Sequence, residues 1–145
     1  MIEAGSPAPE FSLAQIDGRV ETLEQLRAGG SVLLVFYKVS CPTCKLTLPY
    51  LNRVKIRTVG ISQDSAESTA KFARQFGVTI PSVLDLDRDG YRVSNAYGIH
   101  HVPTLFVVSD QGLVLERIGG FDKDALERLG VEFGSEEKVP ESKPG

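Results

Sequence analysis

Several residue types are scarce in this sequence. Among its 145 residues there is no tryptophan, one methionine, two histidines and two cysteines. Two cysteines three positions apart cannot close a long loop as a structural staple, so the pair is redox-active, metal-binding or incidental. The fold must therefore depend on a hydrophobic core, and a chain of this length can bury one.

Long apolar runs and basic stretches are also missing. No run approaches the ~20 apolar residues that cross a bilayer as a helix, so we expect no membrane span. Residues 1–6 contain neither a basic stretch nor an apolar core, and they do not resemble a signal peptide. We expect a cytoplasmic protein if the chain is complete, and a periplasmic or otherwise extracytoplasmic one if an export signal has been removed.

Neither sign of charge is in large excess. The 16 Lys and Arg residues against 19 Asp and Glu residues give a net charge of −3, without a basic stripe, so nucleic acid is not an expected partner. No repeat or inner linker divides the chain, which predicts one domain over residues 1–133, expected to be monomeric. From Gly134 onward, Glu, Lys, Pro, Ser and Gly dominate, which predicts a flexible tail over residues 134–145.

The two cysteines lie in one short motif. Cys41 and Cys44 flank Pro42 and Thr43, directly after the apolar run 32–37. An apolar, β-branched run of this kind is typical of a strand buried on both faces. Pro42 suits the first position of a helix. The motif therefore predicts a dithiol at a helix N-terminus, where the helix dipole and free N–H groups favour a thiolate.

The cysteine motif allows three alternative interpretations. In a redox pair, Cys41 is the exposed attacking thiolate and Cys44 the buried resolving thiol. Half of a zinc site would need two further ligands, and the only histidines, His100 and His101, are adjacent and form a poor ligand pair. Two unrelated core cysteines would not need Pro42 between them. The residues favour the redox pair, with no metal or other cofactor.

Two further features are predicted to lie near the cysteine motif. Lys38, three residues before Cys41, is either a cation that lowers the pKa of the thiol or a solvated lysine at a strand end. Val102 and Pro103 come just before a second apolar strand. Pro103 either starts that strand or follows a cis peptide bond, which would leave backbone groups free to pair with an extended peptide.

The remaining pattern predicts alternating strands and helices. An Asp17-Gly18 turn predicts a hairpin, and Pro49 should kink the helix that contains it. The predicted strands cover residues 10–15, 19–22, 32–37, 55–62 (with one polar face), 81–85, 105–108 and 113–118. The predicted helices begin near residues 22, 42, 65, 91 and 121 and end near residues 29, 53, 76, 97 and 129. This order predicts an α/β fold with a mixed central β-sheet flanked by helices.

Taken together, these motifs resemble the thioredoxin superfamily. The opening residues 5–13 and the hairpin turn are similar, more narrowly, to AhpC/TSA and TlpA-like redoxins. That resemblance implies a thioredoxin-like fold with an N-terminal β-hairpin and an insertion, here residues 81–97, before the cis-Pro strand. It implies a thiol:disulfide oxidoreductase in which Cys41 and Cys44 react. Pro42, Thr43, Val102 and Pro103 would then contact a disulfide- or thiol-bearing substrate, and a redox partner would recycle the pair.

The chain departs from the family patterns at several positions. Ser40 stands where thioredoxins usually have Trp, and Val35 where they often have a buried Asp. The Pro-x-x-x-Thr-x-x-Cys loop of peroxiredoxins is absent, because Leu34 and Lys38 stand at its Pro and Thr positions when the count ends at Cys41. A thiol peroxidase and a non-catalytic thioredoxin-fold binding module remain the alternatives.

Overall fold

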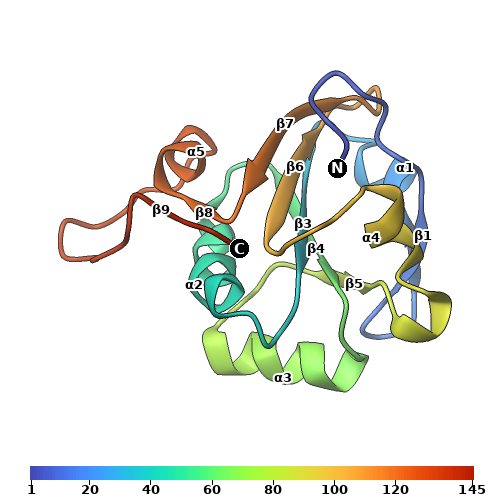
Figure 1. Cartoon of the computed structure of the whole chain (residues 1–145), viewed down its shortest axis with the longest axis horizontal. Coiled ribbons are helices and arrows are strands. Elements are labelled where there is room, and N and C mark those ends of the chain that lie inside the picture. Colours follow the sequence, from blue (N-terminus) through green and yellow to red (C-terminus); the bar gives the residue numbers. More distant parts are fainter.

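The computed structural model, which describes all 145 residues, is built on a seven-stranded mixed sheet (Figure 1). The strand order is β2-β1-β5-β4-β3-β6-β7, and a separate two-stranded ribbon joins β8 to β9. The strands are β1 (Ser12–Gln15), β2 (Val20–Thr22), β3 (Val32–Tyr37), β4 (Arg57–Ser62), β5 (Ser82–Leu84), β6 (Thr104–Val108), β7 (Val114–Gly119), β8 (Phe121–Asp122) and β9 (Ser142–Lys143). The α-helices are α1 (Leu23–Leu26), α2 (Pro42–Tyr50), α3 (Ala66–Phe76), α4 (Arg92–Ala96) and α5 (Lys123–Arg128), with 3-10 turns η1 (Leu51–Arg53) and η2 (Asp87–Asp89).

Strand β3 lies inside the sheet, as its apolar run predicts. It is parallel to β4 on one side and antiparallel to β6 on the other, and all six of its residues are buried. Alternate side chains of a strand point to opposite faces, so β3 contributes to two separate apolar clusters. One contains Leu33, Val35 and Tyr37, and the other contains Val32, Leu34 and Phe36.

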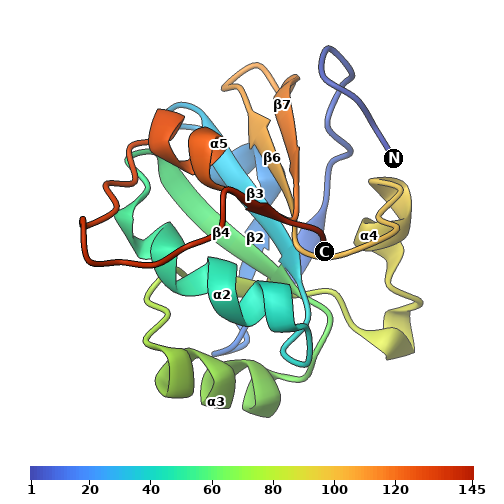
Figure 2. The ribbon, with the colours of Figure 1, turned by 60° about the vertical axis from the view of Figure 1, so that its left-hand side comes forward.

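Helices cover both faces of the sheet (Figures 1 and 2). Apolar residues of α2, α3 and α5 pack with the first cluster, including Leu48, Phe72 and Leu126. Residues of α1 and α4, including Leu26 and Val93, pack with the second. The predicted mixed sheet with flanking helices is therefore confirmed, as is the N-terminal hairpin, in which β1 pairs with β2 around Asp17 and Gly18.

Local capping interactions explain several of the helix ends. The side chain of Thr22 accepts from the Gln25 N–H while the Gln25 side chain accepts from the Thr22 N–H, which forms a capping box. Ser65 caps α3, and Gly77 ends it in the left-handed conformation. The Thr22 and Ser65 side chains each satisfy one of the N–H groups that the first turn of the helix leaves free.

Two predicted elements needed correction. The helix expected over residues 42–53 is α-helical only to Tyr50, one residue after Pro49, and continues as the 3-10 turn η1. The strand expected over residues 55–62 begins at Arg57 and is buried on both faces. It lies between β3 and β5, and its polar Thr58 and Ser62 side chains are hydrogen-bonded inside the protein.

Residues 134–145 lie against the rest of the chain. Their last part contains β9, in which Lys143 and Ser142 pair with Phe121 and Asp122 of β8. The flexibility expected for this segment remains a prediction.

No helix of the structure combines the length and the apolar character needed to cross a membrane.

One glycine of the sheet has no room for a side chain. A Cβ on Gly60 would lie 2.6 Å from Ser82 Oγ and 2.7 Å from Tyr37 Cε1. These two neighbours are themselves joined by a buried hydrogen bond of 2.7 Å between their hydroxyl groups. A larger residue must therefore displace a bonded pair in the core.

We predict that Gly60→Ala lowers the free energy of unfolding by about 1–3 kcal/mol, the usual cost of overpacking a core. Urea denaturation measures this change. Gly29→Ala is the matched control, because a Cβ at Gly29 meets no atom within 4 Å. Equal stability of the two variants would contradict the prediction.

Candidate active site

The site is built where β3 ends and α2 begins. After Tyr37, a short loop leads to Cys41, which is the N-cap of α2, and Pro42 occupies the first turn as expected. The Cys44 N–H donates to Cys41 Sγ at 3.2 Å. The sulfur of Cys41 thus replaces the oxygen of an ordinary capping side chain and satisfies one free N–H of the helix.

The two thiols differ sharply in burial. Cys41 is half-buried, whereas Cys44 is fully buried in the cluster with Val35, Tyr37 and Leu48. Burial raises the pKa of the Cys44 thiol well above its usual range, and the neighbouring Cys41 side chain raises it further. Both cysteines are free in the structure, so it describes the dithiol form.

The loop before β6 lies beside Cys41. The Val102–Pro103 peptide bond is cis, the alternative that the family resemblance implied and that the residues alone left open. Cys41 Sγ donates to the Val102 carbonyl oxygen at 3.4 Å. The Thr104 hydroxyl donates to the His101 carbonyl at 2.8 Å, and the Gly120 N–H donates to the Pro103 carbonyl at 2.8 Å. These bonds hold the loop in place against the dithiol.

The predicted site residues are not all placed alike. Pro42 is exposed and Pro103 buried, while Thr43 is buried and its hydroxyl donates to the Pro144 carbonyl at 2.8 Å. Lys38 is exposed, and its carbonyl accepts from the Cys41 N–H at 3.3 Å. The influence of its ammonium group on the pKa of a thiol remains a prediction.

A small cleft opens beside the dithiol loop. It measures about 80 Å³, and Lys38 lies on it together with residues of the loop before β6. Its lining residues are Lys38, Gln63, Ile99, His100, His101 and Val102. Both histidines are exposed. Nowhere in the structure do three or more His, Cys, Asp or Glu side chains form a group that could hold a metal ion.

The sequence analysis did not identify the residue that fixes the loop before Cys41. Ser65 caps α3, and the residue before it, Asp64, accepts a hydrogen bond from the Val39 N–H through its Oδ2 at 2.9 Å. The Asp64 carboxylate thereby fixes the loop that leads to Cys41. Its place directly after a buried strand, at the same sheet edge as the cysteines, was the available signal.

Buried Asp85 acts on the insertion between β5 and β6. Its carboxylate accepts from the Val93 and Ser94 N–H groups, at 3.2 and 2.7 Å, and from the Ser94 hydroxyl at 2.6 Å. The Gln63 amide in turn donates to Ser94 Oγ at 2.9 Å. This chain of bonds ties α4 to the segment after β4, beside the cleft near the dithiol.

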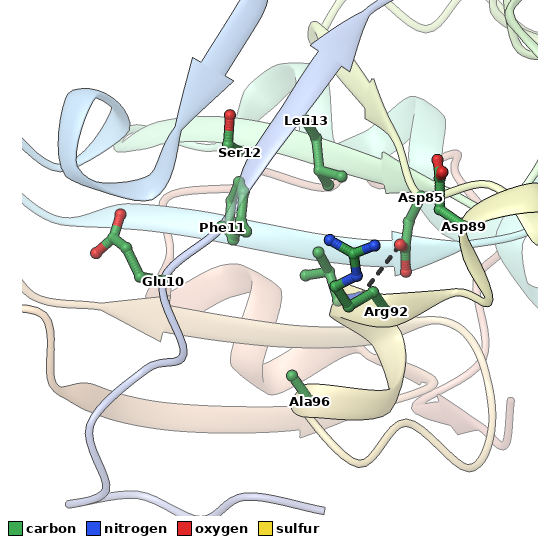
Figure 3. A pocket seen from close by; sticks show the side chains of 9 residues that line it. Glu10, Phe11, Ser12, Leu13, Asp85, Asp89, Arg92 and Ala96 are labelled. Carbon is green, nitrogen blue, oxygen red and sulfur yellow. Dashed lines mark hydrogen bonds between the residues drawn. The ribbon is translucent and has the colours of Figure 1, made fainter.

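A larger cavity, of about 460 Å³, lies at the insertion (Figure 3), and neither cysteine lines it. Its lining residues are Glu10, Phe11, Ser12, Leu13, Asp85, Asp89, Arg92, Val93 and Ala96. Figure 3 shows the Asp85 side chain at the start of α4, where both of its oxygens are already bonded to the helix. The role of this carboxylate is therefore to hold α4.

The arrangement around Cys41 suits thiol–disulfide exchange. One thiol is accessible, a second lies one helical turn away, and a backbone carbonyl lies within bonding distance of the first. A disulfide that reaches Cys41 would therefore meet a nucleophile with its resolving partner already in place.

Comparison with known proteins supports this interpretation. Among curated relatives, the chain is 34% identical over 128 residues to thiol-disulfide oxidoreductase ResA of Geobacillus thermodenitrificans, which covers 82% of this chain and 71% of the relative. It is 32% identical over 128 residues to ResA of Bacillus subtilis, covering 82% and 69% of the two chains.

The fold also matches solved structures. A putative thiol:disulfide interchange protein DsbE from Chlorobium tepidum superimposes with a TM-score of 0.76 at 26% identity, covering 89% of this chain and 94% of that one. The predicted thioredoxin-like fold is thereby confirmed. The AhpC/TSA family model matches residues 4–117, most of the chain. The chain therefore belongs to the AhpC/TSA family.

Proposed function

We propose that the protein is a thiol:disulfide oxidoreductase in which Cys41 attacks and Cys44 resolves. The relatives named above carry this activity in their names, and their substrates are thiols or disulfides. The observation that carries the residue roles is the position of Cys41 Sγ, half-exposed between the Cys44 N–H and the Val102 carbonyl.

The reaction follows from the depth of the two sulfurs. The Cys41 thiolate attacks one sulfur of a substrate disulfide, whose S–S bond breaks and releases the other sulfur as a thiolate. The buried Cys44 thiol then loses its proton and attacks Cys41 Sγ in the mixed disulfide. The second substrate sulfur leaves with the bonding pair, and a Cys41–Cys44 disulfide remains. The substrate gains two electrons, and a thiol-bearing partner restores the dithiol; the reverse sequence oxidises a substrate dithiol.

Burial of Cys44 sets the order of these steps. The raised pKa of this thiol keeps it protonated near neutral pH, so it does not compete with Cys41 for the first attack. Thioredoxins often have a buried Asp where this chain has Val35, which lies in the same cluster as Cys44. Without a carboxylate from that position, we expect resolution by Cys44 either to be slower than in a protein that has the acid or to pass the proton to water.

The substrate is expected to lie across the loop before β6. The Val102 backbone next to cis-Pro103 faces Cys41, and Pro42 is exposed beside it. These groups would bind an extended segment of a protein around its disulfide, with this chain acting as a monomer. Thr43 contributes a hydroxyl at the same edge.

We predict that the protein reduces insulin with a dithiol reductant and that Cys41→Ser abolishes this turnover. Cys44→Ser is expected to retain the first attack and to accumulate the mixed disulfide, because the resolving thiol is missing. Turbidity follows insulin reduction, and non-reducing electrophoresis with mass spectrometry detects the adduct.

The two alternatives predict different results. A non-catalytic binding module would give no dithiol-dependent turnover in the wild-type protein. A thiol peroxidase would consume hydrogen peroxide far faster than free cysteine does in stopped-flow measurements. Either result would replace the proposed function.

We also predict how the reactivity of Cys44 depends on pH. In the folded Cys41→Ser variant, burial continues to raise the pKa of Cys44, so its alkylation by iodoacetamide should be slow and should keep rising from pH 7 to 10. After unfolding in guanidinium, the same thiol should react faster and level off above its ordinary pKa of about 8.5. Mass spectrometry measures both rates, and a plateau near pH 8 in the folded variant would contradict a buried Cys44.

A further inference from the structure

Residues 141–145 lie on the dithiol site. The Thr43 hydroxyl, between the two cysteines, donates to the Pro144 carbonyl at 2.8 Å. The next residue, Gly145, lies so close to the Val102 carbonyl that a Cβ on it would collide with that oxygen. This is the same carbonyl to which Cys41 Sγ donates. Figure 2 shows the last residues passing between α5 and α2 to reach this place.

Backbone pairing leads the segment to the site. Lys143 and Ser142 pair antiparallel with Phe121 and Asp122 of β8, and the Lys123 N–H donates to the Glu141 carbonyl at 2.9 Å. The segment is thus an added strand on the β8 edge, a mode in which main-chain bonds provide most of the affinity. Beside it, Gly120 leaves room for the Lys143 carbonyl, because a Cβ there would overlap with that oxygen.

An ion pair anchors the segment farther back. The Glu137 carboxylate accepts two bonds from the Arg53 guanidinium, at 2.7 and 3.1 Å, and one from the Gly134 N–H at 2.8 Å. Val139 packs against the apolar cluster of α2 and α5. Residues 134–140 therefore form a tether that keeps residues 141–145 near the site, at a high effective concentration.

We propose that residues 141–145 occupy the binding site for polypeptide substrates and compete with them. The inference rests on the proposed function. Thr43 and the Val102 backbone are among the groups expected to hold a substrate, and the segment already lies on both. A substrate peptide that extends along the β8 edge must displace it.

The chemistry of the segment indicates the class of substrate. It is held mainly through backbone groups, with one exposed ion pair of 3.8 Å between Glu141 and Lys123. Its five residues are all exposed, and a glycine lies against Val102. An extended peptide with a small residue at that point would make the same bonds. A small-molecule disulfide needs only Cys41 and does not use the β8 edge. Residues 141–145 should therefore slow the reaction with polypeptide disulfides and leave the reaction with small disulfides unchanged.

The test uses variants of the whole chain of residues 1–145. Because the Lys123 N–H donates to Glu141, the Phe121–Lys143 pair is the next hydrogen-bonded pair of the ladder. Lys143→Pro removes the donor of that pair and should release the segment. Ser135→Pro is the matched control, since it places proline second in the turn closed by the Glu137 N–H and the Gly134 carbonyl, where proline is favoured.

We predict that Lys143→Pro raises kcat/KM for insulin about 3- to 10-fold, the effect of losing one or two net hydrogen bonds in the closed state. The kcat/KM of the same variant for 2-hydroxyethyl disulfide should differ from that of the wild type by less than about twofold. Ser135→Pro should behave as the wild type with both substrates. A synthetic peptide of residues 134–145 should inhibit insulin reduction by Lys143→Pro, and a scrambled peptide should not.

Each outcome bears on a separate claim. Equal insulin kinetics for wild type and Lys143→Pro, with dithiol turnover intact, would overturn the competition. An equal rise for the small disulfide would overturn the assignment to polypeptide substrates, because the segment would then shield Cys41 from every reagent. Absence of turnover with both substrates in all variants would instead contradict the proposed function.

Discussion

The site depends on the burial of β3 on both of its faces. Its six side chains enter two clusters, three on each side, and each buried aliphatic or aromatic side chain contributes about 1.5–3 kcal/mol. A shift of one residue along the strand would exchange the two sets, so the register is strongly fixed. Cys41 follows the end of β3 by only four residues, and its position is therefore set by the core of the protein.

This fixed strand end also explains why two similar thiols differ. One helical turn separates Cys41, at the N-cap, from Cys44, which faces the first cluster with Val35 and Tyr37. The same hydrogen bond that caps the helix joins the Cys44 N–H to the Cys41 sulfur. Exposure of one sulfur and burial of the other thus need no additional residues. Burial keeps the proton on Cys44, through its raised pKa, and leaves the first attack to Cys41.

Features encoded locally could be predicted from the sequence, and features made by distant contacts could not. The apolar run of β3, the helix start at Pro42 and the end of a helix near residue 76 each depend on neighbouring residues, and the structure has all three. The polar face expected for β4 was wrong because that face of the sheet is covered rather than open to solvent: Thr69 of α3 bonds the Ser62 hydroxyl, and the Thr58 hydroxyl bonds the Ile56 carbonyl. The cysteine pair was evident from its spacing. The contacts of Asp64 with Val39 and of Thr43 with Pro144 join residues 25 and 101 positions apart. The place of Asp64 after a buried strand indicated the sheet edge on which it lies, but neighbouring residues could not identify its partner or that of Thr43.

The site is assembled from parts of unequal stability. The β3 end and α2 belong to the core, whereas residues 141–145 are exposed and held mainly by backbone bonds to a two-residue strand. Segments with few buried contacts open at far lower free energy than the core does. Release of this segment therefore leaves the dithiol, the cis-Pro loop and the Asp64 bond unchanged. Binding and release of residues 141–145 change how often the β8 edge is free for a substrate. They do not change the chemistry at Cys41, because the segment and the dithiol are held by different contacts.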